Sequence, residues 1–213
     1  LLLTFCKIEP KELLPKAWHV WLLSIQAVSS GIIALLLIFC PMEEAYRDIF
    51  EGAMVCLICP TATAAAVITG KLGGSASTLT TYTLLSNVLA AIAVPLVFPL
   101  VEPHADITFV VAFLKILSKV FPLLLAPFFI ALLFRYYIPS VHRLLSKYHG
   151  VAFYLWAVAL TIVTGQTVRS LVTAAADVSI EIMIALAGLA TCCLQFYFGK
   201  RIGSAYHDRI SAG

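Results

Sequence analysis

Charged side chains are scarce in this chain, and their scarcity excludes a soluble globular protein. Only 12% of the 213 residues are Asp, Glu, Lys or Arg, and 62% are hydrophobic, whereas about a quarter of the residues in soluble domains are charged. The mean hydropathy is +1.00, and several segments approach the ~20 apolar residues that a helix needs to cross a bilayer. The composition therefore predicts an all-α polytopic membrane protein whose surroundings are the lipid bilayer.

Motifs for catalysis and metal binding are also missing. The sequence contains no G-x-S-x-G, no H-E-x-x-H and no Walker-type glycine loop, so we do not expect an enzyme. Cys56 and Cys59 have the spacing of a redox or zinc half-site, but no second pair and no histidines at ligand spacing accompany them. Free cysteine in an apolar segment behaves as a small hydrophobe. We therefore expect no metal and no cofactor.

Six apolar segments are predicted to be complete transmembrane helices. The fourth is interrupted by Pro122 and Pro127, and Gly199 is expected to end the sixth. The chain opens with six apolar residues and no initiator Met, so we interpret it as a fragment that begins within the end of a seventh helix. The six predicted spans are 18–39, 49–69, 76–100, 107–137, 151–172 and 178–198.

The second predicted span is interrupted in its middle by the run Cys59-Pro60-Thr61-Ala62-Thr63. Proline removes a backbone donor, and at membrane depth the freed backbone groups are tolerated mainly where they are buried in protein or line a cavity. Broken helices of this kind form the ion and substrate sites of secondary transporters. A proline kink without a function is the alternative, since proline is common in membrane helices.

Polar side chains within the spans are the next candidates for a site. Gln26 lies in the first span, and Thr83 and Asn87 lie one turn apart in the third. Amides offer the carbonyl oxygens that hard cations such as sodium prefer. Hydrogen bonding between helices explains the same residues equally well.

The loop charges predict the orientation of the chain. Acidic residues dominate the loops after the first, third and fifth spans, and basic residues dominate the alternate loops and both ends. Because Lys and Arg are enriched on the cytoplasmic side, we expect a multi-pass protein of the cell inner membrane with both ends cytoplasmic. The net charge of +3 then reflects topology, and no nucleic-acid partner is expected. The basic residues of these alternate loops and ends are Lys7, Lys11, Lys16, Lys71, Arg135, Arg143, Lys147, Lys200, Arg201 and Arg209.

The run from residue 59 to 74, CPTATAAAVITGKLGG, is followed by LTTYTL at 79–84. Together they resemble the bile acid:sodium symporter family, and its bacterial members in particular. The resemblance implies a fold of about ten helices in two inverted repeats, from which this chain lacks the first helix and the last two. It divides the single incomplete transporter domain 1–213 into core helices (18–100), panel helices (107–172) and the start of the second core half (178–199).

The resemblance also implies a sodium site beside the broken helix. Gln26 matches a sodium-site glutamine of the family, and Thr83 matches a threonine ligand. Thr61 and Thr63, together with carbonyls freed by Pro60, are expected to supply further oxygens. The positive N-terminal end of the half-helix after the break suits a carboxylate. The residues expected to contact the substrate are Pro60, Thr63, Ala64 and Asn87.

One departure from the family bears on the coupling ion. Ala65 and Ala66 stand where well-studied members have Ser-Asn as sodium ligands, and alanine has no side-chain oxygen. The leading hypothesis is a secondary active transporter of a small organic anion, coupled to sodium by symport and working by alternating access. The alternatives are a proton-coupled or uncoupled transporter of the same fold and a membrane ligand-sensing domain without transport.

Overall fold

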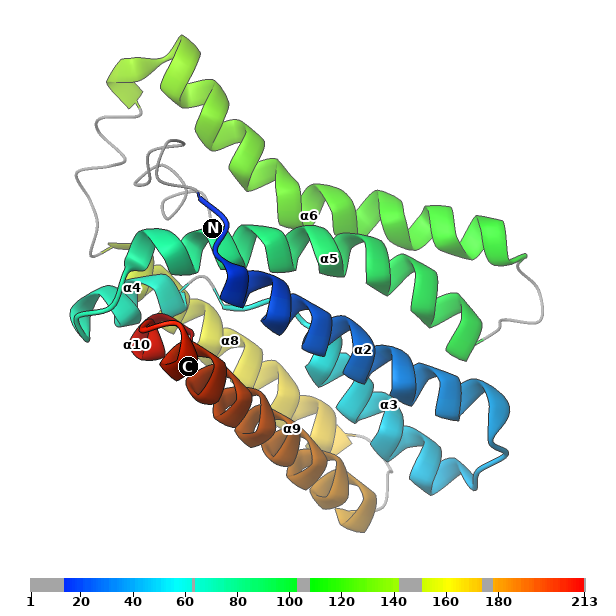
Figure 1. Cartoon of the computed structure of the whole chain (residues 1–213). Coiled ribbons are helices and arrows are strands. Elements are labelled where there is room, and N and C mark those ends of the chain that lie inside the picture. The colour runs from blue at the N-terminus through cyan, green and yellow to red at the C-terminus, as the bar shows by residue number, and fades with distance from the viewer. Residues whose placement is uncertain (1–13, 63, 103–107, 142–150, 174–177, 213) are drawn as a thin grey trace.

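The computed structural model describes residues 14–62, 64–102, 108–141, 151–173 and 178–212, and the regular structure in these ranges is helical (Figure 1). Within these ranges, five helices are long and apolar enough to cross a membrane. The predicted multi-pass, all-helical architecture is therefore confirmed. The predicted helix end in residues 1–6 lies outside the described ranges. The five helices are α2 (Ala17–Phe39), α5 (Ala76–Val101), α6 (Phe109–Tyr137), α8 (Val151–Thr173) and α9 (Val178–Ala205).

The second predicted span is divided into two helices, as its proline predicts. Helix α3 covers Glu44–Ile58 and α4 covers Ala64–Lys71. Between them, Cys59 has φ −58° and ψ 134°, the extended conformation that a following proline imposes. Pro60 itself has no N–H to continue the ladder. Helix α3 begins five residues before the predicted residue 49.

Helix α5 carries the longest buried stripe and packs against α2, α4 and α6. Helix α2 packs against α3 and α5, α3 packs against α9, α6 covers one side of α5, and α8 contacts α4. Apolar clusters join α2 to α5 at one end and α2 to α3 at the other. The predicted division into core helices, panel helices and the start of a second core half stays a prediction.

The fourth predicted span is one helix that its prolines bend, and the predicted end of the sixth span at Gly199 is wrong. Helix α6 continues through Pro122 and Pro127 and bends near its middle (Figure 1), because a single proline removes one ladder bond and kinks a helix without ending it. Helix α9 passes through Gly199, which is buried, and ends seven residues after the predicted Phe198. A glycine costs a helix only about 1 kcal/mol, which packing against α3 outweighs.

Helices α4 and α9 end in the same way. After α4, Gly73 has φ +86° and the Gly74 N–H donates to the Thr69 carbonyl at 2.9 Å. After α9, His207 has φ +58° and the Asp208 N–H donates to the Gly203 carbonyl at 2.8 Å. This is the Schellman arrangement, in which a left-handed residue allows the next N–H to satisfy a terminal carbonyl.

The chain after α9 folds back over the starts of α2 and α5. Helix α10 (Arg209–Ala212) places the Ser211 hydroxyl where it accepts the Ser75 N–H at 3.0 Å. Just before α10, the Asp208 carboxylate accepts the Lys16 ammonium at 2.5 Å and the Trp18 indole N–H at 3.2 Å. These contacts join α2, α5 and α9 at one end of the bundle.

Candidate functional site

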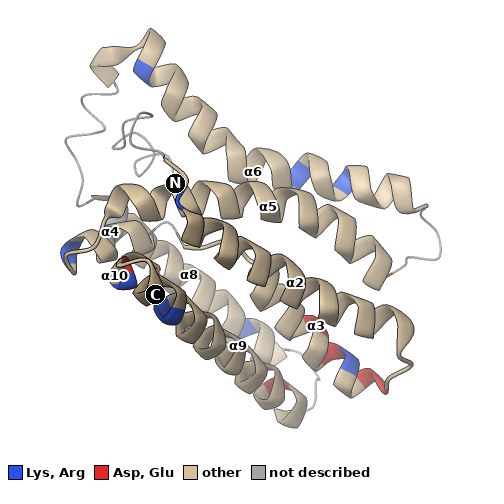
Figure 2. Ribbon diagram, in the orientation of Figure 1, with Lys and Arg blue, Asp and Glu red and all other residues tan. Residues whose placement is uncertain are grey.

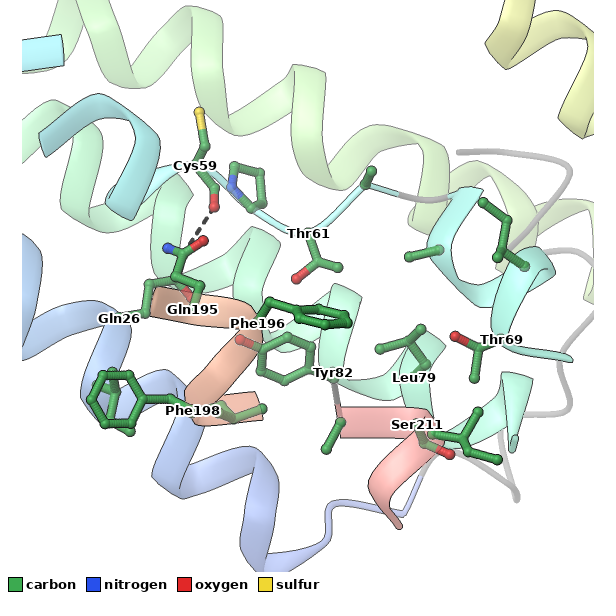
Figure 3. Close-up of a pocket in the computed structure, with 18 of the residues that line it drawn as sticks. Gln26, Cys59, Thr61, Thr69, Leu79, Tyr82, Gln195, Phe196, Phe198 and Ser211 are labelled. Atoms are coloured by element: carbon green, nitrogen blue, oxygen red, sulfur yellow. Dashed lines mark hydrogen bonds between the residues drawn. The ribbon is translucent and has the colours of Figure 1, made fainter. Parts of the chain in front are cut away.

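A cavity of about 530 Å³ lies beside the break between α3 and α4 (Figure 3). Its walls come from α2, the 59–62 segment, α4, α5, the end of α9 and α10. Most of the lining is apolar, and a small set of polar side chains reaches it, which is the usual composition of a small-molecule site. The polar lining residues are Gln26, Ser29, Thr61, Thr69, Tyr82, Gln195 and Ser211.

Gln26 contacts the end of α3 at this cavity. Its Nε2 donates to the carbonyl oxygens of Ile58 and Cys59, each at 3.2 Å, and its Oε1 accepts the Ser86 hydroxyl at 3.2 Å. The side chain is 7% exposed. The last carbonyls of a helix have no partner within the helix and carry its partial negative charge. The Gln26 amide therefore places a donor at a position that is electrostatically suited to a cation.

The segment between the half-helices contributes Pro60 and Thr61 to the cavity wall. Tyr82 of α5 lines the same cavity as Thr61, and both side chains are labelled in Figure 3. Ala64 begins α4, so the N-terminal end of that half-helix follows directly after the break. The predicted ligand Thr63 lies outside the described residues.

The other two predicted site residues, Thr83 and Asn87, belong to α5 and do not line the cavity. Thr83 is buried, and its hydroxyl donates to the Leu79 carbonyl of its own helix at 2.9 Å. Asn87 is 2% exposed, and its Nδ2 has no hydrogen-bond partner among the described residues. The structure thus places Gln26, Pro60 and Thr61 around one cavity, while Thr83 and Asn87 lie on the buried face of α5.

Ser86, Gln195 and Tyr82 are among the residues of the site that were not predicted from the sequence. Ser86 binds the Gln26 amide, and its position three residues after Thr83 would have placed it on the predicted polar face. Gln195 donates to the Leu57 carbonyl at 3.5 Å, and it is an amide in an apolar span, the same signal that selects Gln26. Tyr82 has no signal of its own in the sequence.

A polytopic helical protein with a broken helix beside a mostly apolar cavity that a few polar side chains reach has the architecture of a secondary transporter. The model of the Sodium Bile acid symporter family matches residues 4–174 of the chain. This match covers well over half of the chain, so the protein belongs to the sodium bile acid symporter family, a family of transporters. Helix α9 and α10 lie beyond the matched residues. Comparisons with curated proteins and with solved structures gave no match.

Proposed function

We propose that the protein is a secondary active transporter that couples sodium to the movement of a small organic anion, by alternating access around Pro60. The observation that carries this proposal is the contact of the Gln26 amide with the terminal carbonyls of α3, inside a cavity at a helix break. Half-helix C-terminal ends coordinate cations in transporters with discontinuous helices. The site has such an end and a movable side chain beside it.

Rotating the Gln26 side-chain amide by half a turn would replace a hydrogen-bond donor with an oxygen ligand for a cation. The turn replaces Nε2 with Oε1, which then joins the carbonyl oxygens of Ile58 and Cys59 around a sodium ion. Ser86 permits both orientations, since a hydroxyl that donates to Oε1 also accepts from an N–H. Thr61, on the same cavity wall, is the proposed side-chain ligand from the break, and Thr63 and Thr83 remain proposed ligands from the family resemblance.

The organic anion is proposed to lie at the start of α4. The N-terminus of a helix offers free N–H groups and partial positive charge to a carboxylate. Pro60 and Ala64 flank this end, with Thr63 as a further proposed contact. The buried Nδ2 of Asn87 has no hydrogen-bond partner in the part of the chain that the structure describes, and an anion that reaches α5 would accept a hydrogen bond from it.

A second candidate, proton-coupled or uncoupled transport, is favoured by one observation. Ala66 is 3% exposed and Ala65 lines the cavity, so the two positions that supply sodium ligands in the family offer no side-chain oxygen here. A membrane ligand-sensing domain without transport is distinguished from both candidates by the absence of substrate uptake.

The charges support a location in the cell inner membrane with both chain ends cytoplasmic. In Figure 2 basic residues lie at the start of α2, at α4 and at the ends of α9 and α10, at one end of the bundle, and the acidic start of α3 lies at the other. We refer to the first as the basic end. Membrane-impermeant labelling of single cysteines at Lys71 and Glu102 tests the proposal: only the cysteine at Glu102 should react from outside.

The decisive experiment measures thermal unfolding of the full-length protein in sodium and in potassium at equal ionic strength. A bound ion stabilises the folded state by mass action, so wild type should melt higher in sodium, and Gln26→Ala should lose the difference. Gln166→Ala, which removes an exposed amide from α8, is the matched control. An unchanged sodium shift in Gln26→Ala removes Gln26 from the site, and no shift in folded wild type favours the second candidate.

Pro60→Ala tests the role of the break itself. The substitution restores a backbone donor between α3 and α4, so uptake of the anion should fall while membrane insertion continues. Wild-type uptake by this variant would mean that the break is only a kink.

A further inference from the structure

A basic groove on α9 and α10 shares the wall residue Phe196 with the transport cavity but has no role in the proposed function. It is formed by Phe196, Tyr197, Lys200, Arg201, Ser204 and Arg209, and it encloses about 650 Å³. We propose that this α9 groove binds the phosphate headgroup of an anionic phospholipid. The inference goes beyond transport and does not depend on the coupling ion.

Two of the three cations, Lys200 and Arg201, are held in place by aromatic side chains. The Lys200 ammonium lies 4.4 Å from the centroid of the Phe196 ring, and an Arg201 guanidinium N–H donates to the Tyr197 hydroxyl at 3.0 Å. Within the described ranges, no carboxylate forms an ion pair with Lys200, Arg201 or Arg209. The Lys200 and Arg201 side chains are therefore ordered by aromatic neighbours, while the charge of all three cations stays available to an anion.

The acidic residue that lies nearest to the groove in sequence is Asp208, and it is paired with α2. Asp208 directly precedes Arg209, but its carboxylate accepts hydrogen bonds from Lys16 and Trp18 of α2. Its negative charge is therefore compensated by Lys16 and does not cancel the cations of the groove.

Aromatic side chains place the groove at headgroup depth. Phe196 and Tyr197 are each 54% exposed, and nearby at the basic end the Trp21 indole N–H donates to the Tyr206 hydroxyl at 3.1 Å. Tyr and Trp concentrate at the level of the headgroups. One turn deeper, α9 exposes apolar side chains such as Leu194 to the acyl region.

This arrangement selects a ligand with two parts. Lys200 and Arg209 offer charge to a phosphate, and the exposed apolar surface of α9 offers contact to an acyl chain. Basic pockets at the ends of membrane helices bind lipid headgroups in this manner. A free phosphate or a soluble phosphorylated molecule uses only the first part. Under the proposed orientation, the lipid comes from the cytoplasmic leaflet.

The test is a titration of the purified full-length protein in detergent with dioleoyl-phosphatidylglycerol and, separately, with dioleoyl-phosphatidylcholine, followed by the unfolding midpoint. Wild type should be stabilised more by the anionic lipid. Lys200→Gln with Arg209→Gln should weaken the apparent affinity for it about 10- to 30-fold, since each surface cation contributes about fivefold. The control, Lys119→Gln with Arg169→Gln, removes two cations outside the groove and should keep wild-type affinity.

Additional variants and a soluble anion distinguish lipid binding from misfolding and from a site for a free anion. The charge-preserving pair Lys200→Arg with Arg209→Lys should retain lipid binding, and Arg209→Gln alone should show about a fivefold loss even if the double variant does not fold. Equal loss in the control pair, or no preference for the anionic lipid in wild type, overturns the proposal. Stabilisation by glycerol phosphate as strong as that by the lipid also overturns it, because the groove would then be a site for a free anion.

Discussion

The side-chain nitrogen of Gln26 lies 3.2 Å from the carbonyl oxygen of Cys59, the residue at which α3 stops. A residue of one helix thus caps the broken end of another, 33 positions away in sequence. The cap satisfies carbonyls that proline leaves without a helical partner. The orientation of one rotatable amide therefore decides whether a donor or an oxygen faces the terminal carbonyls of α3.

Ser86→Ala should weaken the response to sodium without abolishing the fold. The variant removes the hydroxyl that holds the Gln26 amide, so sodium affinity should fall about 2- to 10-fold, the value of one hydrogen bond. The measurement is the unfolding midpoint as a function of sodium concentration. Ser118→Ala removes an exposed hydroxyl that bonds only within α6 and should leave the titration unchanged; a wild-type titration in Ser86→Ala contradicts the amide-rotation mechanism.

Asn87→Leu should raise stability and lower uptake. The buried Nδ2 of Asn87 has no partner among the described residues, so replacing it with an apolar group of similar size should stabilise the fold by about 1 kcal/mol. Thr83→Val, which removes a hydroxyl that has a partner, should not raise the midpoint. A destabilised Asn87→Leu variant would show that Asn87 has a partner in the folded protein.

Gly74→Ala should destabilise the protein by about 2 kcal/mol, because overpacking costs roughly 1–3 kcal/mol. A Cβ at this position would lie 2.6 Å from the Thr69 methyl and 2.9 Å from the Ile210 side chain. Gly31→Ala is the matched control, since no atom lies within 4 Å of its added Cβ; it should be neutral or stabilising in α2. Equal midpoints for the two variants in thermal unfolding would show that α10 does not pack on this turn.

His207→Gly should stabilise the protein by up to about 1 kcal/mol. His207 holds a left-handed conformation with φ +58°, which costs residues with a Cβ about 1–2 kcal/mol, while the added freedom of glycine in the unfolded chain offsets part of the gain. His207→Ala keeps the Cβ and should give no comparable rise in the unfolding midpoint. If both variants behave alike, the effect comes from the imidazole and not from the backbone.

The contact between Lys16 and Asp208 should make stability depend on pH in the acidic range. Burial alone would raise the pKa of Asp208, but the hydrogen bond and charge of Lys16 and the hydrogen bond from Trp18 lower it below its usual value. A depressed folded pKa gives stability that is present above the unfolded pKa, about 4, and is lost as pH falls through the folded pKa. The gain is at most about 1 kcal/mol because Lys16 is exposed.

Asp208→Asn supplies the measurement for this pair. Its midpoint should lie below that of wild type at neutral pH, and the gap should narrow as pH falls below about 4. A constant gap at all pH values would mean that the carboxylate contributes through packing.

The sequence predicts the local features of this fold better than the distant contacts. The break at Pro60 follows from a missing backbone donor, and the apolar spans follow from composition, so both are visible in the chain itself. The prediction that Gly199 ends the sixth span is wrong because the free-energy cost of a glycine within a helix is smaller than the stabilisation that α9 gains from packing. The contact between Gln26 and Cys59 depends on how α2 and α3 pack, which no local pattern specifies. Ser86 and Gln195 had a signal, since each is a polar side chain in an apolar span.

The short return of the chain after α9 has a mechanical consequence. Asp208 binds the first turn of α2, and Ser211 binds the first residue before α5. Moving α9 away from either helix at this end would break an ion pair and hydrogen bonds together. We therefore expect α2, α5 and α9 to move together as one rigid body. The hinge of any large conformational change should lie outside the contacts that residues 208–212 make.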